Sequence, residues 1–155
     1  MIKVLFVCLG NICRSPMAHM VFLNMVRELG LENNFEVDSA GTEGYNELHH
    51  AGIHRGTKEV LRKNGIPFDE HYSRKLRKHD YEYYDYIVAM DSENIQDIEF
   101  ILGEDKDNKI SKLLDYTDKP RDIRDPWYTG NFDETFEDVV DGCCAFLKHL
   151  EFLND

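Results

Sequence analysis

One stretch near the N-terminus decides the fold: Val7-Cys8-Leu9-Gly10-Asn11-Ile12-Cys13-Arg14-Ser15-Pro16. It follows a short apolar run, which predicts a buried β-strand. It precedes a helical pattern that places Pro16 at the first helical position, where its missing N–H is no loss. A loop between a strand end and a helix N-terminus can direct backbone N–H groups and the helix dipole at an anion. We therefore expect an anion-binding loop here.

The residue types in this loop fit a phosphate group. Gly10 tolerates unusual backbone angles, and the guanidinium of Arg14 is a planar fork of donors that matches phosphate oxygens. These surroundings favour the thiolate form of Cys8, and Ser15 can add a hydroxyl hydrogen bond to the sulfur. We interpret Cys8 as a nucleophile that attacks phosphorus. The other reading is a small buried cysteine on a turn, with Arg14 in solvent. The predicted phosphate-binding residues are Leu9, Gly10, Asn11, Ile12, Cys13, Arg14 and Ser15.

Four motifs in the sequence together resemble the low-molecular-weight protein tyrosine phosphatases. They are the Cys-x5-Arg-Ser loop, Asp38-Ser39-Ala40-Gly41-Thr42, Tyr86-Ile87-Val88-Ala89-Met90-Asp91 and Asp125-Pro126-Trp127-Tyr128. They occur in the expected order, and the resemblance covers essentially the whole chain. It implies a cysteine-dependent hydrolase of phosphotyrosine and small aryl phosphates that works through a phosphocysteine, without a metal or cofactor.

Hydrophobic periodicity predicts an α/β fold with a single domain over residues 1–155. We expect a four-stranded parallel sheet with helices on both faces and the Cys-x5-Arg phosphate loop after the first strand. Ligands bind such sheets outside the carboxyl ends of the strands, where all four motifs fall. The predicted strands are 2–7, 35–39, 86–90 and 110–114. The predicted helices are 16–29, 51–64, 77–84, one capped by Ser92 and ending at Gly103, and a final one with an apolar stripe from Phe136 to Leu153. Residues 115–131 are predicted to be a long loop.

Expulsion of an alkoxide or phenoxide from a phosphate ester requires a general acid. We predict Asp125 in the long loop, as the resemblance implies. The other reading is that Asp125 and Pro126 merely begin a turn, and Asp118 and Asp122 are alternative acids nearby.

The resemblance implies that Ile12, Tyr45, Trp127 and Tyr128 line a cleft for an aromatic ring. The family often has Tyr where Trp127 stands, and these rings could instead pack against the core. Related arginine phosphatases carry Thr at the position of Ile12, so this residue favours the tyrosine branch.

The resemblance also suggests residues that support the loop. Ser39 is expected to pair with Asn11, while His71 and Asp91 are expected near Ser15 or its neighbours. Asp91 could instead simply favour the start of a helix, and His71 could be a surface histidine. Cys13 is a candidate partner for a reversible disulfide with Cys8, or a packing residue.

The formal net charge of −12 argues against nucleic acid or an anionic membrane as a general partner. No apolar run approaches the about 18 residues of a membrane span. Lys3 is the only positively charged side chain before the first apolar run, and no cleavage site follows it, so no signal peptide is predicted. The four cysteines do not form a secreted disulfide pattern, and no zinc spacing occurs. We expect a cytoplasmic protein that acts on phosphotyrosine-containing proteins, a monomer or a weak dimer.

Four other functions fit parts of the pattern. An arsenate reductase would need further cysteines near the loop, and residues 80–100 contain none. A protein arginine phosphatase is disfavoured by Ile12. A phosphocarrier with a loop cysteine needs no general acid, so Arg14 and Asp125 together favour hydrolysis. A non-catalytic anion-binding module would keep its function without Cys8.

Overall fold

A computed structural model describes residues 1–154 of the chain; Asp155, the last residue of the predicted domain, lies outside the described residues. The strands are β1 (Ile2–Cys8), β2 (Phe35–Gly41), β3 (Tyr86–Ala89) and β4 (Ile110–Lys112). The helices are α1 (Arg14–Glu28), α2 (Tyr45–Leu48), α3 (Arg55–Lys63), α4 (Asp80–Tyr83), α5 (Ser92–Leu102), α6 (Pro126–Thr129) and α7 (Phe132–His149). Two 3₁₀ segments, η1 (Glu32–Asn34) and η2 (Leu113–Tyr116), complete the elements.

The four strands form one parallel sheet in the order β2-β1-β3-β4. β1 is therefore an inner strand, and its last residue, Cys8, lies opposite Gly41 of β2. The predicted four-stranded parallel sheet is confirmed. Parallel strands bring their carboxyl ends to one edge, so the segments that follow β1, β2 and β3 meet there.

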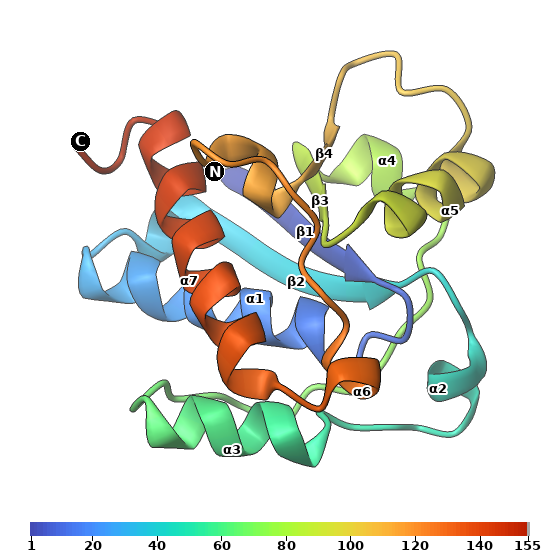
Figure 1. Cartoon of the computed structure of the whole chain (residues 1–155). Coiled ribbons are helices and arrows are strands. Elements are labelled where there is room, and N and C mark those ends of the chain that lie inside the picture. Colours follow the sequence, from blue (N-terminus) through green and yellow to red (C-terminus); the bar gives the residue numbers. More distant parts are fainter. Residues whose placement is uncertain (155) are drawn as a thin grey trace.

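Alternate side chains of β1 enter two separate clusters of buried residues. Val4 and Phe6 pack on the side of α1 and α7, whereas Leu5 and Val7 pack on the side of Ile98 in α5. Figure 1 shows α1 and α7 side by side over one face, with α5 away from them near β3 and β4. Helices on both faces, as predicted, bury the sheet and leave its carboxyl edge for the site.

Four helices begin at other residues than predicted, among them α4, which begins at Asp80 and not at Arg77. α1 begins at Arg14, so Pro16 is its third residue, which is tolerated because the N–H groups of the first turn lack helical partners anyway. α3 begins at Arg55 because the side chain of His54 caps it. α5 is capped by Asp91 and not by Ser92, since Asp91 Oδ1 accepts the N–H of Asn94 at 2.7 Å.

The region after β4 differs most from the prediction. The strand expected over 110–114 ends at Lys112, because Leu113 and Leu114 turn into η2 and are fully buried in the cluster with α7. The loop expected over 115–131 contains the second half of η2 and all of α6, which Asp125 caps. α7 ends at His149, although Leu153 beyond it still packs on the core.

Candidate active site

The loop between β1 and α1 forms the floor of a cleft at the carboxyl edge of the sheet. The cleft has a volume of about 240 Å³. Its lining includes the predicted loop residues Cys8, Leu9, Gly10, Ile12, Cys13 and Arg14, with Asp125, Tyr45, Trp127 and Tyr128. The structure thus brings together the predicted nucleophile, acid and aromatic walls from three segments of the chain. Asn11 and Ser15 are fully buried behind the loop.

Hydrogen bonds to the surroundings turn the carbonyl groups of the loop outward. Five carbonyl oxygens of the loop accept hydrogen bonds from neighbouring segments. Thr42 N donates to the carbonyl of Cys8, Glu43 N to that of Leu9, His54 N to that of Ile12, and Thr57 Oγ1 to that of Cys13. The carbonyl of Gly10 accepts from both Asn46 Nδ2 and Ser73 Oγ. A trans peptide group points its N–H away from its carbonyl, so the N–H of each following residue faces into the loop. Asn11 shows this directly, because its N–H lies 3.3 Å from Cys8 Sγ. Converging N–H groups of this kind bind oxyanions.

The sulfur of Cys8 is held by two groups of the loop. Ser15 Oγ lies 3.0 Å from Cys8 Sγ, and the N–H of Asn11 lies on the same sulfur. Asn11 Nδ2 donates to Ser15 Oγ at 2.8 Å, so the hydroxyl proton of Ser15 can be directed to the sulfur or to the carbonyl of Ala40 at 3.4 Å. Donors at the N-terminal end of α1 favour an anionic sulfur.

The second loop cysteine has a different environment. Burial, and then the nearby charge of Cys8, raise the pKa of the Cys13 thiol to about 12. Cys13 is therefore protonated at neutral pH, which disfavours it as a nucleophile.

The side-chain hydrogen bonds of Asn11 connect the loop to the rest of the fold. Its φ of 54° lies in the left-handed region, which Asn tolerates better than most residues. Its Nδ2 donates to Ser15 Oγ and to Ser39 Oγ at 3.0 Å, so the predicted pairing with Ser39 is present. Its Oδ1 accepts from His71 Nε2 at 3.0 Å and from Arg74 N at 3.1 Å. His71 thus contacts Asn11, and also Ser39 Oγ at 3.1 Å.

β2, which lies beside β1, packs closely against the back of the loop at Gly41. A Cβ atom at Gly41 would lie 2.8 Å from the carbonyl oxygen of Leu9 and 3.1 Å from Cβ of Asn11. Both are closer than side-chain carbons normally approach their neighbours, so glycine is required at this position.

Three potential metal ligands meet behind the loop. One ligand atom each from His19, Asp38 and His71 lie within 4.8 Å of one another. His19 Nδ1 and His71 Nε2 already contact Ser39 Oγ, at 3.3 and 3.1 Å. Asp38 accepts from Arg74 Nε at 3.1 Å, and this guanidinium beside the single carboxylate opposes a cation. We interpret the group as polar support for the loop.

Burial controls the protonation of these two histidines. It lowers the pKa of His19 to about 4, and neighbouring His71 adds to the effect. Burial also lowers the pKa of His71, against the opposing influence of Asp38. Both rings are therefore neutral near pH 7.

Arg14 links the loop to two acidic residues. Its Nη1 donates to Asp91 Oδ2 at 2.5 Å and to the carbonyl of Ile123 at 2.8 Å, and its Nη2 lies 3.5 Å from Asp125 Oδ2. Burial acts to lower the pKa of Arg14, but Cys8, Asp91 and Asp125 raise it overall. Arg14 is thus a fixed charge, while Asp91 both caps α5 and orients this guanidinium.

Asp125 both begins a short helix and faces the loop. Its Oδ1 accepts the N–H of Trp127 at 3.0 Å, which caps α6, and its Oδ2 is the oxygen near Arg14. Of the three predicted acids, Asp125 is the one that lines the cleft with Cys8. Asp122 accepts from Ser92 and Lys112, and Asp118 lines a different groove.

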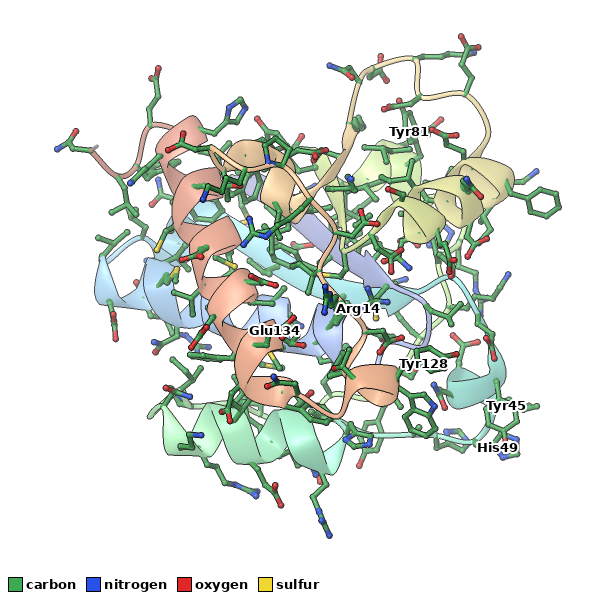
Figure 2. The ribbon with its side chains drawn as sticks, in the orientation of Figure 1. Arg14, Tyr45, His49, Tyr81, Tyr128 and Glu134 are labelled. Atoms are coloured by element: carbon green, nitrogen blue, oxygen red, sulfur yellow. The ribbon has the colours of Figure 1, made fainter. Side chains whose placement is uncertain are left out.

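The aromatic walls stand on two short helices at the mouth of the cleft. Tyr45 on α2 is 61% exposed, and Trp127 and Tyr128 on α6 are 62% and 79% exposed. Packing of these rings into the core, the other reading of the sequence, is wrong. The ring of His49 lies 4.4 Å from that of Tyr45, and Figure 2 shows this pair at α2.

Sequence reasoning missed three residues at the site. Glu43 and Asn46 line the cleft, and Asn46 also holds the carbonyl of Gly10 at 2.9 Å. His54 donates its N–H to the carbonyl of Ile12 at 2.8 Å. Glu43 and Asn46 lie in a segment without hydrophobic periodicity, and His54 lies in a predicted helix whose pattern does not indicate a contact with the loop.

The fold and the site define a class: α/β proteins that hold an oxyanion in a Cys-x5-Arg loop. The sequence profile described as "Low molecular weight phosphotyrosine protein phosphatase" matches residues 3–152, and the chain belongs to this family.

Two relatives and one further structure illustrate the family match. The protein-tyrosine-phosphatase YfkJ of Bacillus subtilis is 43% identical, with 97% of each chain covered, and its crystal structure matches with a TM-score of 0.90. The low molecular weight phosphotyrosine protein phosphatase of Schizosaccharomyces pombe is 41% identical, covering 96% of this chain and 97% of that one. The structure of DARP, a drosophila arginine phosphatase, is 30% identical with a TM-score of 0.86 over 99% of this chain and 100% of that one.

Proposed function

We propose that this chain hydrolyses phosphotyrosine in proteins, and small aryl phosphates, through a phosphocysteine intermediate. The observation that carries the proposal is the loop itself: Cys8 Sγ lies among inward-facing N–H groups, with Arg14 and Asp125 in the same cleft. Family membership supports it, because the relatives are named as tyrosine phosphatases.

In the first step, the thiolate of Cys8 attacks phosphorus opposite the aryl oxygen. The S–P bond forms as the P–O bond to the aryl group breaks, and Asp125 gives its proton to the leaving oxygen. The loop N–H groups and the guanidinium of Arg14 hold the three remaining oxygens, where positioning and charge stabilisation do most of the work.

In the second step, water replaces the departed phenol. Asp125, now a carboxylate, takes a proton from the water as its oxygen attacks phosphorus. The S–P bond breaks, inorganic phosphate leaves, and Cys8 returns as a thiolate hydrogen-bonded by Ser15 and Asn11. Neither step uses a metal or a cofactor.

The shape of the cleft supports an aryl substrate. Tyr45, Trp127 and Tyr128 surround the space above the loop, and a planar ring can lie between them. Ile12 also lines the cleft and offers an apolar contact. These features favour phosphotyrosine over phosphoarginine, arsenate or a transferred phosphate.

We further propose that Cys13 protects the nucleophile. Peroxide would convert Cys8 to a sulfenic acid, and the sulfur of Cys13 would then displace water to form a disulfide. The raised pKa of Cys13 makes this step slow at neutral pH. Mass spectrometry after peroxide treatment should find the Cys8–Cys13 linkage, and Cys13→Ser should instead yield over-oxidised Cys8.

For its setting, we propose one domain over residues 1–155 that acts on phosphotyrosine-containing proteins in the cytoplasm, as a monomer or a weak dimer. The four cysteines are all unpaired thiols, which suits a reducing compartment. Across residues 1–154, no helix has the length and apolarity to cross a membrane.

The test is hydrolysis of p-nitrophenyl phosphate and a phosphotyrosine peptide by freshly reduced protein in EDTA. Wild type should turn over both, Cys8→Ser should lose at least about 10⁴-fold, and Asp125→Ala should be slowed. Absence of turnover by the wild-type protein would overturn the proposal.

A further inference from the structure

The side chain of His54 lies at the junction of the phosphate loop, α3 and the aromatic wall. Its backbone N–H donates to the carbonyl of Ile12 at 2.8 Å, which ties it to the loop. Its Nδ1 accepts the N–H of Gly56 at 2.9 Å, which caps α3. Its ring meets the indole of Trp127 edge-on, with centroids 5.7 Å apart and planes at 81°.

The opposite side of the His54 ring is braced by Phe132. The two rings stack with centroids 5.1 Å apart and planes at 18°. Phe132 also packs on the backbone of Gly56, where a Cβ would lie 2.5 Å from its ring. The imidazole therefore has a fixed position, set by a hydrogen bond on one edge and a stacked ring on one face.

Trp127, in contrast, needs an external support. It lies on α6, which has four residues, and is 62% exposed. Its backbone N–H is fixed by Asp125 at 3.0 Å, but that bond does not orient the indole. The ring contact that the structure gives to Trp127 is the one with His54.

We propose that His54 is a positioning residue that holds the indole of Trp127 against the phosphate loop and so sets the preference of the cleft for aryl over non-aryl phosphates. The inference rests on the proposed function, because it concerns the substrate class of the same cleft. The position of this wall relative to the loop is therefore set by the contacts of His54 with Ile12 and Trp127, in addition to α6.

Two variants separate the two roles of His54. In His54→Asn, the side-chain oxygen can still accept the N–H of Gly56, since Asn is a strong N-cap, but no ring supports Trp127. In His54→Phe, a ring is restored but the cap is lost. His50→Asn is the matched control: His50 has a left-handed φ of 52°, which Asn tolerates, and it does not line the cleft.

The experiment measures direct binding of phenylphosphonate and of inorganic phosphate by calorimetry. In His54→Asn, we expect phenylphosphonate to bind about 3- to 10-fold more weakly while phosphate changes less than about 2-fold. His54→Phe should recover most of the phenylphosphonate affinity, and His50→Asn should match wild type. Trp127 is the single tryptophan of the chain, so its fluorescence reports this wall alone, and acrylamide should quench it more strongly in His54→Asn.

Two results would overturn the inference alone: equal phenylphosphonate affinity in wild type and His54→Asn, or an equal loss for both ligands. The first would mean that His54 does not position the wall, and the second that it acts only on the loop. If wild-type protein bound neither ligand, the proposed function would fail, and this inference with it.

Discussion

The floor and the rim of the cleft are built in opposite ways. The floor is contiguous in sequence, from Cys8 to Ser15, is mostly buried, and bonds five of its carbonyls outward. The rim comes from α2 and α6, and its rings are more than half exposed. Buried, mutually bonded groups hold one geometry, whereas exposed groups on short helices can change without disturbing it. The chemistry is thus fixed by the floor, and the choice of substrate is left to the rim.

The largest effect that bears on this comparison is expected where floor and rim meet, at Asp125. Asp125→Ala should lower kcat/KM, which reports the first step alone, about 10²- to 10⁴-fold for an aryl phosphate with a poor leaving group, because the phenoxide leaves unprotonated. The loss should be much smaller for p-nitrophenyl phosphate, whose leaving group needs little protonation. A leaving-group series measures this, and an equal loss across the series would contradict the role of Asp125 as the acid.

The support behind the floor should make stability depend on pH. The pKa of His19 is lowered from 6.5 to about 4 in the folded protein, so between these values the unfolded state binds the extra proton. The free energy of unfolding should therefore fall as pH drops from 6.5 toward 4, by up to about 3 kcal/mol, and the effect should be absent above pH 6.5.

His19→Gln is the matched variant, since its amide can still bond Ser39. Urea unfolding of both proteins at several pH values checks the prediction. Identical pH dependence in the two proteins would show that His19 titrates normally.

A single methyl group behind the floor should disturb both stability and binding. Gly41→Ala places a Cβ 2.8 Å from the carbonyl oxygen of Leu9, so the loop must shift. We expect a loss of about 1–3 kcal/mol in the free energy of unfolding and weaker binding of inorganic phosphate. Gly65→Ala is a useful contrast: its φ is positive, but nothing lies within 4 Å, so it should affect stability and leave phosphate binding unchanged.

The smallest effect is expected at the rim. Tyr45→Ala should raise KM for a phosphotyrosine peptide about 3- to 10-fold through loss of a ring contact, with the unfolding free energy changed by less than about 0.5 kcal/mol. Steady-state kinetics and urea unfolding of the same preparation test both parts. A large loss of stability would mean that the rim is part of the core after all.

The same contrast explains what the sequence could predict. The floor was predictable because its residues are adjacent and lie between a strand and a helix with clear periodicity. Ser39, Asp91 and Asp125 were predicted from the resemblance of their motifs to those of the phosphatase family. Hydrophobic patterning also indicated the four strands: β1 and β3 are apolar runs, β2 is short and alternating, and β4 gives a weaker signal.

The features that the sequence did not predict depend on how distant segments of the chain meet in the folded protein. Asn46, His54 and Arg74 bond to the loop from segments distant in sequence, so only the folded path of the chain brings them there. Leu113 and Leu114 read as strand, but their burial in the cluster with α7 favours a 3₁₀ turn. Tertiary packing overrides local pattern in such places.

The central claim is that Cys8 carries the phosphoryl group during turnover. The most direct measurement is rapid acid quenching of the protein during hydrolysis of p-nitrophenyl phosphate, followed by peptide mass spectrometry. We predict one phosphoryl group, on the peptide that contains Cys8, which appears within the first turnover and is absent in Cys8→Ser. Phosphate on another residue, or turnover by Cys8→Ser at the wild-type rate, would contradict the account.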